Sequence, residues 1–429
     1  MREMKRHVGV LGLKETGYLS SLYLAEKGYQ VFATDLSSND AVKKNAENLR
    51  LKGIEAECGG HSMERIISQD WFLISPGIPP ASELYQKITT TGKPVHSEIE
   101  VAHWFSQAKS VIAVTGSCGK TTLATLIATL IEAVGGKAVL CGNIGNPWIG
   151  ELARIDRDTT VVLEVSSFQL MHCSKFSPEV GILLNVYPNH MDWHHDMAEY
   201  ANAKLMLFKN MRNSGTMICR KKDERTFFPD FKTAAKRVYF DEGRDENPNC
   251  AALLCVADVL GISEQKTRSV FAGFPGIEHR LERFLTHKGT VFINDSKCTT
   301  PASLAWALEK FSDGTVVLVC GGKAKSSDFG TLKDLVAKKV KCAILIGTSR
   351  HMIRDSWRGA TEILETADFD EACDWVVKKS APGDVALLSP ACASFDMFKN
   401  YQDRGRIFKE KIHQRMKING AGICLKCEK

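Results

Sequence analysis

Residues 111–122 read Val-Ile-Ala-Val-Thr-Gly-Ser-Cys-Gly-Lys-Thr-Thr. An apolar run with β-branched side chains enters a turn that holds two glycines, and an amphipathic stretch follows directly. A strand that passes through such a turn into a helix points backbone N–H groups and the positive end of the helix at one place, where a phosphate binds. The segment predicts a nucleotide site in which Lys120 reaches the β- and γ-phosphates and Thr121 holds Mg²⁺.

The glycine spacing of this loop differs from the commonest phosphate-loop pattern. The sequence is Gly116-x-x-Gly119-Lys120-Thr121, which is shorter than GxxxxGK[ST] because residue 114 is Val. The alternative is an ordinary strand–turn–helix connection without a ligand. The strand before the loop and the amphipathic stretch after it favour the nucleotide site.

Glu164 supplies a carboxylate that would complete a magnesium site. It follows the apolar run Val161-Val-Leu. A buried carboxylate without a partner is costly, and a cation beside the phosphate loop would remove that cost. The alternative is a structural glutamate held in a salt bridge.

Residues 184–196 read Leu-Asn-Val-Tyr-Pro-Asn-His-Met-Asp-Trp-His-His-Asp. Three histidines and two aspartates in one segment could belong to a metallohydrolase centre, but no other His-rich segment supplies the remaining ligands of a two-zinc site. We therefore favour a role in binding a second metal or the substrate over the alternative of surface histidines.

A second glycine-containing turn, Gly9-Val-Leu-Gly12-Leu-Lys-Glu-Thr-Gly17, follows an apolar run near the N-terminus. Asp35 ends the next apolar run, which is typical of a dinucleotide site. The glycine spacing does not match GxGxxG, so the turn equally fits a uridine nucleotide.

Apolar runs and amphipathic stretches alternate along all 429 residues, which predicts an α/β fold with parallel sheets. At about 150 residues per domain the length favours about three domains, which we place at 1–108, 109–276 and 277–429. The expected helices include residues 16–28, 120–135 and 299–311. The expected strands include residues 8–13, 31–35, 71–75, 111–116, 138–142, 161–166, 180–186, 291–295, 316–320, 342–347 and 385–389.

The composition excludes several classes of protein. The chain is 44% hydrophobic and 25% charged, which excludes a disordered or fibrous protein. It has no run near 18 apolar residues and no secretory signal, so we expect no membrane span. Its 14 cysteines are scattered, which indicates reduced thiols in the cytoplasm, although Cys424 and Cys427 have metal or redox spacing. The net charge of +6 comes without an arginine-rich arm, so we expect no nucleic-acid partner.

Taken together, these motifs resemble the Mur ligase family over nearly the whole chain. The resemblance implies three domains, each with a mainly parallel sheet flanked by helices: a Rossmann-like N-terminal domain, a central P-loop ATPase domain and a Rossmann-like C-terminal domain. Residues 389–396 discriminate best among the members of the family. The segments that carry the resemblance are residues 12–17, 75–78, 97–100, 115–122, 142–145, 163–170, 189–192, 203–205, 279–280, 294–297, 321–323, 389–396 and 398–401.

The resemblance also implies roles for single residues. Those that would bind the UDP-linked substrate are Thr16, Asp35, Ser75 and Asn143. Those that would bind ATP are Gly116, Ser117, Cys118, Gly119, Lys120, Thr121, Thr122, Asn249, Arg280 and Asp295. Those that would hold two Mg²⁺ ions are Thr121, Glu164, His190 and a carbamylated Lys204. Those that would bind D-glutamate are Thr299, Lys325, Ser394 and Tyr401. The catalytic group would consist of Lys120, Lys204, His190, Asp295 and Lys297.

The chain departs from the family pattern in three places. Asp245 and Glu246 stand where the family has His-Asn before the residue equivalent to Asn249, and the central domain is short after Lys204. Both changes fall on the adenine side of the expected ATP site. Tyr401 stands where the family often has Phe.

The activity implied by the resemblance is the ATP-dependent addition of D-glutamate to UDP-N-acetylmuramoyl-L-alanine through an acyl phosphate, in peptidoglycan synthesis. We expect a cytoplasmic monomer. The alternatives are a sister ligase or a folylpolyglutamate-type ligase with another amino acid, an ATPase or kinase that phosphorylates and releases, and a nucleotide-binding homologue without activity. The presence of Lys120, Glu164, His190 and Lys204 argues against the last.

Lys325 tests the assignment of the amino-acid site. If this lysine pairs with the side-chain carboxylate of D-glutamate, Lys325→Met should raise the KM for D-glutamate and leave the KM for ATP nearly unchanged. D-Glutamine, D-alanine and L-glutamate should be much poorer substrates, because each leaves the lysine unpaired or misplaced. Steady-state kinetics measure both effects. An unchanged KM for D-glutamate, or better use of L-alanine, would favour a sister ligase.

Overall fold

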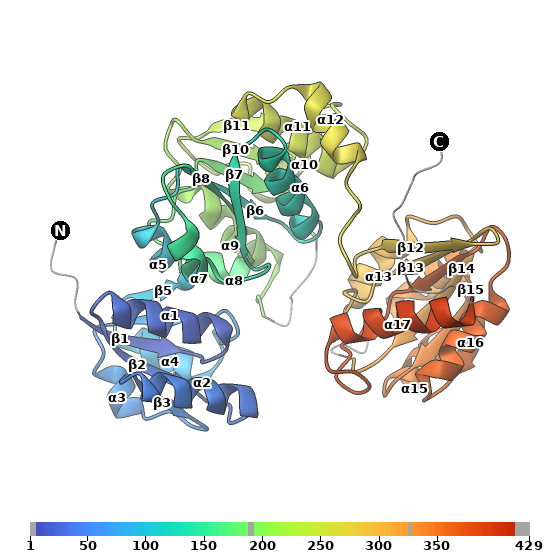
Figure 1. The fold of residues 1–429 in the computed structure, drawn as a ribbon, viewed down its shortest axis with the longest axis horizontal. Coiled ribbons are helices and arrows are strands. Elements are labelled where there is room, and N and C mark those ends of the chain that lie inside the picture. Colours follow the sequence, from blue (N-terminus) through green and yellow to red (C-terminus); the bar gives the residue numbers. More distant parts are fainter. Residues whose placement is uncertain (1–5, 188–192, 325–327, 417–429) are drawn as a thin grey trace. The chain divides into compact units, whose positions relative to one another are not determined.

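The computed structural model describes residues 6–187, 193–324 and 328–416. The chain divides into two compact units, Met1–Phe274 and Pro275–Lys429, and contains three sheets flanked by helices (Figure 1). This confirms the predicted α/β class with mainly parallel sheets. The domain boundaries at 108 and 276 stay predictions. None of the helices in the described residues is long and apolar enough to span a membrane.

The first sheet is fully parallel, with the strand order β3-β2-β1-β4-β5. In a doubly wound sheet of this order, ligands bind at the carboxyl ends of the strands, near the point where the order reverses beside β1. Its strands are β1 (His7–Leu11), β2 (Gln30–Asp35), β3 (Glu55–Cys58), β4 (Trp71–Ile74) and β5 (Val95–Ser97). Its helices are α1 (Glu15–Glu26), α2 (Asp40–Leu51), α3 (Met63–Ile67), α4 (Glu83–Thr90) and α5 (Glu98–Phe105).

The second sheet is also parallel, with the order β11-β10-β9-β6-β8-β7, and it places the phosphate-loop strand β6 between β9 and β8. Its strands are β6 (Ser110–Thr115), β7 (Lys137–Gly142), β8 (Thr159–Glu164), β9 (Val180–Leu183), β10 (Thr216–Cys219) and β11 (Lys236–Tyr239). Its helices are α6 (Lys120–Glu132), α7 (Trp148–Glu151), the 3₁₀ turn η1 (Leu152–Arg154), α8 (Ser167–Leu170), α9 (Met197–Lys209), α10 (Lys221–Phe227), α11 (Pro248–Leu260) and α12 (Glu264–Ala272).

The third sheet has the order β12-β13-β17-β14-β15-β16, in which only the pair β12–β13 is antiparallel. Apolar clusters cover both of its faces. Its strands are β12 (Glu282–His287), β13 (Thr290–Asn294), β14 (Val316–Gly321), β15 (Val340–Ile346), β16 (Glu362–Glu365) and β17 (Val385–Leu388). Its helices are α13 (Pro301–Leu308), the 3₁₀ turn η2 (Gly330–Leu332), α14 (Lys333–Lys339), α15 (Arg350–Ser356), α16 (Phe369–Lys379) and α17 (Tyr401–Arg415).

The first two sheets share one apolar core. The same cluster of buried side chains contains Val8 and Leu73 from the first sheet and Val161 and Leu163 from the second. A shared core of this kind explains why residues up to Phe274 form one unit.

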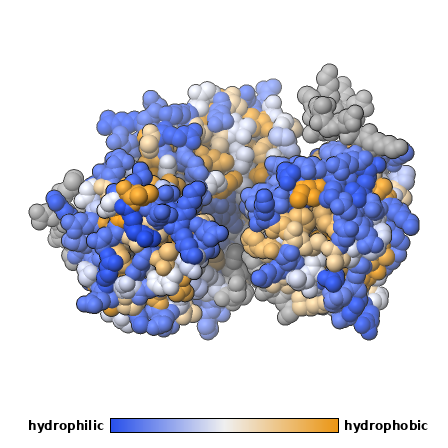
Figure 2. Space-filling model, turned by 60° about the horizontal axis from the view of Figure 1, so that its bottom comes forward, coloured by the Kyte–Doolittle hydropathy of each residue, from blue (hydrophilic) through white to orange (hydrophobic). Residues whose placement is uncertain are grey.

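Polar residues cover most of the face shown in Figure 2, and the apolar residues there lie in small patches.

Glu100 on α5 ties the first sheet to the second. Its buried carboxylate accepts hydrogen bonds from the indole of Trp104 at 3.1 Å and from three consecutive backbone N–H groups, those of Ser174 (3.0 Å), Lys175 (3.0 Å) and Phe176 (2.8 Å). Burial opposes ionisation, but the hydrogen bonds from Lys175, Trp104 and Phe176 outweigh it and lower the pKa of Glu100. The ionised carboxylate therefore holds the loop after α8 in place.

Glu100→Gln should lower the free energy of unfolding at pH 7 by about 2 kcal/mol. The substitution removes the negative charge that strengthens these hydrogen bonds, and it places the NH₂ group of the new amide opposite backbone N–H groups, which are also donors. The pKa of Glu100 is lower in the folded protein than in the unfolded chain, so its ionised carboxylate stabilises the folded state at pH values above the unfolded pKa. This stabilisation is lost as the pH falls through the folded pKa. The difference between wild type and variant should therefore shrink below about pH 4.5, the ordinary value. Urea denaturation between pH 3 and 7 measures it. The exposed Glu47→Gln is the control, and a pH-independent difference would contradict the charge argument.

Candidate active site

The phosphate loop joins β6 to α6 and requires both of its glycines. Gly116 has a φ of 149° and Gly119 a φ of 82°, a backbone region that other residues rarely adopt. A Cβ atom at Gly119 would lie 2.7 Å from Cδ2 of Leu184 and 3.3 Å from Oδ1 of Asn249. The loop is therefore packed closely against the end of β9 and the start of α11.

Asn185 fixes the shape of this loop and was not among the predicted site residues. Its Oδ1 accepts the backbone N–H groups of Ser117 at 3.0 Å and Cys118 at 2.9 Å, and its amide donates to the Cys118 carbonyl at 3.0 Å. The sequence offered one signal: Asn185 is a polar residue near the end of the predicted strand 180–186, and in the structure this strand, β9, neighbours the loop strand β6. Parallel strands end at one edge of a sheet, so a polar side chain there reaches the loop.

Lys120 and Lys204 both donate to the carbonyl oxygen of Gly116. The Nζ–O distances are 2.8 Å for Lys120 and 3.1 Å for Lys204. Lys204 is 1% exposed, and its Nζ lies 4.2 Å from the centroid of the Tyr200 ring. Burial, together with the nearby charge of Lys120, lowers the pKa of Lys204 well below its ordinary value. The surroundings of Lys204 thus disfavour its charged form.

Tyr200 and Ser117 form the wall beside this lysine. The hydroxyl groups of Tyr200 and Ser117 lie 3.1 Å apart, and Ser117 donates to the Tyr187 carbonyl at 2.9 Å. Burial raises the pKa of Tyr200 to about 12, so the phenol keeps its proton at neutral pH. His194 packs in the same region, with its ring stacked on Phe168. The predicted His190 lies outside the described residues.

Thr121, Glu164 and Asn143 form an oxygen-rich cluster beside the loop, in which Thr121 and Glu164 are buried and Asn143 is exposed. The Thr121 hydroxyl donates to Glu164 at 2.7 Å, and the Asn143 amide donates to the other carboxylate oxygen at 2.8 Å. Glu164 is 2% exposed. A hydroxyl and a carboxylate are ligands suited to Mg²⁺, so the donor set fits the ion expected at Thr121 and Glu164.

Three of the four residues predicted for the UDP-linked substrate lie around a separate cavity of about 800 Å³ at the carboxyl edge of the first sheet. They are Thr16, Asp35 and Ser75. Asp35 accepts the backbone N–H groups of Leu13 at 2.7 Å and Ser37 at 2.8 Å, so it shapes the turn before α1. The structure places the fourth, Asn143, against Glu164 instead.

In the second unit, Asp295 follows β13 and is buried. It accepts hydrogen bonds from the Ser389 hydroxyl at 2.7 Å and the Leu281 backbone N–H at 3.1 Å. Burial raises the pKa of Asp295 to about 7, although these hydrogen bonds and the charge of Arg280 oppose the shift. Two other predicted residues meet nearby, since Lys297 donates to the Tyr401 hydroxyl at 3.0 Å.

The remaining predicted residues have different surroundings. Ser394 is buried and Thr299 is half-buried, whereas Lys325 lies outside the described residues. Asn249 lies in the first turn of α11, next to the phosphate loop, and belongs to the first unit. Arg280 belongs to the second unit. Asp245, one of the two residues that depart from the family pattern, forms an ion pair with Arg268 at 2.7 Å.

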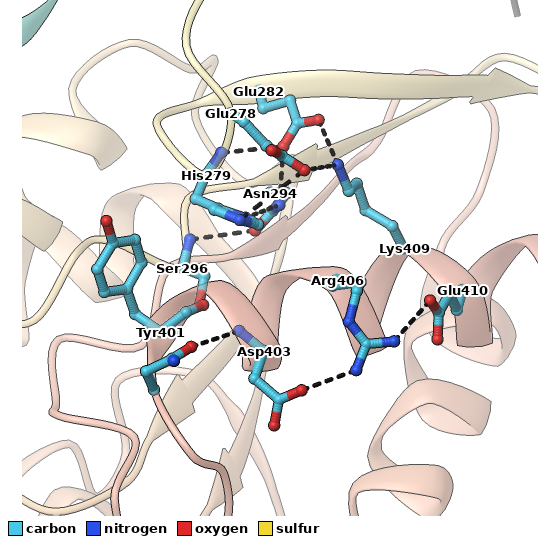
Figure 3. A network of polar contacts seen from close by, with 11 residues as sticks. Glu278, His279, Glu282, Asn294, Ser296, Tyr401, Asp403, Arg406, Lys409 and Glu410 are labelled. Carbon is cyan, nitrogen blue, oxygen red and sulfur yellow. Dashed lines mark hydrogen bonds and ion pairs between the residues drawn. The ribbon is translucent and has the colours of Figure 1, made fainter. Parts of the chain in front are cut away.

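Arg404 is a buried arginine of the second unit that joins several of its segments, and it was not among the predicted site residues. Its guanidinium donates to the Ser296 hydroxyl at 3.0 Å, the Ser296 carbonyl at 2.8 Å and the Cys392 carbonyl at 3.1 Å. It therefore fixes α17, which begins at Tyr401, against the segments that carry Lys297 and Ser394. Figure 3 shows the adjoining polar network, in which the Ser296 hydroxyl donates to the Tyr401 carbonyl at 2.8 Å.

Three family models match the chain, each over one of the three sheets. They are the Mur ligase MurD-like N-terminal domain at residues 6–97, the Mur ligase middle domain at 114–268 and the Mur ligase glutamate ligase domain at 279–392. The UDP-N-acetylmuramoylalanine–D-glutamate ligase of Desulfovibrio desulfuricans is 36% identical over 416 residues, which covers 94% of this chain and 95% of that protein. The same ligase of Koribacter versatilis is 34% identical, with 95% and 97% covered.

Solved structures share the fold at low identity. The MurF ligase of Thermotoga maritima in complex with ADP matches with a TM-score of 0.60 at 14% identity, over 97% of this chain and 99% of that one. MurF of Acinetobacter baumannii matches with a TM-score of 0.56 at 15% identity, over 95% and 90% of the two chains.

Lys120→Ala should reduce ATP-dependent turnover by roughly two orders of magnitude, the scale expected when a transition state is deprived of one electrostatic interaction. The reason is that Lys120 places an ammonium group on the loop itself, donating to the Gly116 and Ser117 carbonyls. Lys137→Ala, which removes an exposed lysine of the same sheet, is the control and should keep the wild-type rate. Retained activity in Lys120→Ala would mean that the loop is structural.

Proposed function

The chain belongs to the Mur ligase family, and we propose that it is the ATP-dependent ligase that joins D-glutamate to UDP-N-acetylmuramoyl-L-alanine in peptidoglycan synthesis. The observation that carries this conclusion is the full-length match to ligases of that name, combined with a side-chain cluster at each sheet that suits one part of the reaction. ATP and Mg²⁺ belong to the chemistry of this family.

The loop residues 116–122 would bind the phosphates of ATP, and Thr121 and Glu164 would hold one Mg²⁺. The ion would offset negative charge on the phosphates and on the transferring group. Glu164 supports this assignment because it is buried and accepts hydrogen bonds from two neutral groups, the Thr121 hydroxyl and the Asn143 amide. Asn249, Arg280 and Asp295 would contact the same nucleotide.

Lys204 would carry a carbamate and, with His190, face a second Mg²⁺. The neutral amine attacks the carbon of CO₂ and releases one proton, so that the product is an N-carboxylate anion. Two features support this proposal: burial and Lys120 disfavour the protonated amine, and the new anion would lie beside the Lys120 cation. Carboxylate-type oxygen is a ligand that Mg²⁺ prefers.

In the proposed reaction, the carboxylate of UDP-N-acetylmuramoyl-L-alanine accepts the terminal phosphoryl group, and ADP leaves. The amine of D-glutamate then attacks the acyl carbon and displaces phosphate, which yields the amide. Lys120 balances the charge that develops during phosphoryl transfer, and the loop orients the reacting groups. Thr16, Asp35, Ser75 and Asn143 would hold the UDP-linked substrate.

The second unit would bind D-glutamate through Thr299, Lys325, Ser394 and Tyr401. The contact between Lys297 and Tyr401 supports a polar site at this place, and Arg404 keeps its backbone segments together. We also propose that the enzyme acts as a monomer in the cytoplasm, where ATP is available.

A phosphate-release assay tests the function. Release of phosphate should require ATP, UDP-N-acetylmuramoyl-L-alanine and D-glutamate together, and the amide should form in equal amount. Phosphate release without amide would indicate an ATPase or kinase. A requirement for another amino acid would indicate a sister ligase.

Lys204→Ala should be inactive, and added acetate or formate should restore part of the rate, because a short carboxylate replaces the missing oxygen ligand. A lysine that acts only as a cation predicts no rescue by anions. Lys209→Ala removes an exposed lysine from the same helix and should be active without acetate. Absence of rescue at every concentration, with the variant folded by circular dichroism, would refute the carbamate.

A further inference from the structure

His61 lines the cavity at the carboxyl edge of the first sheet, shortly after β3. It is half-buried, and its Nδ1 lies 2.8 Å from the hydroxyl oxygen of Thr34 on β2. The same hydroxyl oxygen lies 2.8 Å from Oε1 of Glu57 on β3. The three side chains thus form a short chain of hydrogen bonds that ends at the cavity.

The direction of this chain fixes the tautomer of His61. Burial opposes ionisation of Glu57, but the two hydrogen bonds from Ser62 outweigh it and lower the pKa of Glu57, so the carboxylate only accepts. The single hydroxyl proton of Thr34 therefore goes to Glu57 at 2.8 Å, since its other acceptor, the Gly60 carbonyl, is 3.4 Å away. The hydroxyl oxygen then accepts the Nδ1–H of His61.

A neutral imidazole that donates from Nδ1 has an acceptor at Nε2. Burial lowers the pKa of His61, which keeps the ring neutral at pH 7 although the charges of Glu57 and Asp35 oppose the shift. Nδ1 is bonded to Thr34, and His61 lines the cavity, so Nε2 is the ring nitrogen that we assign to a molecule bound there. The hydrogen bonds of His61 therefore leave its Nε2 as a hydrogen-bond acceptor before any ligand binds.

The rest of the cavity indicates which part of a nucleotide lies at His61. The N-terminus of α1 lies beside the cavity at Lys14 and Thr16, and the positive end of a helix suits the diphosphate. The base then lies away from this helix N-terminus. Toward β3, Leu36 is 70% exposed and lines the cavity together with Met63, so an apolar surface is available to the flat face of a base.

We propose that His61 selects the base of the nucleotide: its Nε2 accepts the N3–H of uracil, with the Thr34–Glu57 pair holding the ring in the required tautomer. Uracil has a donor at N3, whereas cytosine has an acceptor there, so two acceptors would face each other if a cytidine nucleotide bound. A site built to pair with a donor rejects an analogue that lacks it. The inference rests on the proposed function, in which the substrate is a uridine nucleotide.

Isothermal titration calorimetry with UDP, CDP and 3-methyl-UDP tests the proposal on the full-length protein. Wild type should bind UDP at least roughly tenfold more tightly than the other two, the scale of one missing hydrogen bond. His61→Phe should bring all three affinities close together. Thr34→Val keeps the ring but frees its tautomer, so the UDP preference should fall to an intermediate value. Glu64→Gln, an exposed change on α3, is the control and should keep the wild-type ratio.

A second variant keeps the test decisive if His61→Phe does not fold. His61→Gln presents either an amide oxygen or an amide nitrogen and should also bring the UDP and CDP affinities together. Equal affinities in wild type, or an unchanged ratio in the folded His61 variants, would overturn the proposal. If UDP-N-acetylmuramoyl-L-alanine is still converted in that case, the proposed function stands and only the role of His61 fails. If wild type neither binds UDP nor converts that substrate, both fail.

Discussion

Two lysine side chains donate to one backbone carbonyl at the end of β6, and this contact sets the charge distribution beside the phosphate loop. Lys120 and Lys204 lie 2.8 and 3.1 Å from the Gly116 oxygen. Two ammonium groups so close together repel strongly where water is scarce, and Lys204 is the more deeply buried. The repulsion is relieved if Lys204 gives up its proton, and it becomes an attraction if Lys204 acquires a negative charge.

The parallel arrangement of the second sheet brings the other groups to this point. The register of β6 with β8 places Val114 beside Glu164, so the glutamate ends next to the loop. The end of β9 delivers Asn185, whose side chain holds the Ser117 and Cys118 amides. Each group comes from a different strand, but all of them lie at the carboxyl edge of the sheet. The rigid sheet therefore holds residues of several loops in fixed positions relative to one another.

Much of the fold could be predicted, because central strands and capped helices leave strong patterns in a sequence. The helix expected from residue 120 begins at Lys120 as predicted, whereas the one expected over 299–311 is Pro301–Leu308. Thr300 caps that helix and Pro301 occupies its first turn, where a missing N–H costs nothing, so it cannot begin earlier. The strands missed were mostly at sheet edges, such as β3 and β16, whose half-exposed sequences are rich in glutamate.

The site was predictable only where a motif marks it. The glycines and lysine of the loop are local in sequence, whereas the contacts of Asn185, Arg404 and the pair Thr34–His61 join segments that are far apart. No periodicity reports which polar side chain will meet a distant backbone group, because that depends on the register of the sheet.

The two units also share a feature that no pattern revealed, since each buries a group whose charge is poorly compensated. Lys204 is such a group in the first unit and Asp295 in the second, and burial shifts the pKa of each toward its neutral form. Replacing either by an apolar side chain would remove a cost to folding. Groups of this kind are typical of sites where a bound ligand supplies the missing charge. They lower the stability of the fold, and proteins keep them where binding or catalysis requires them.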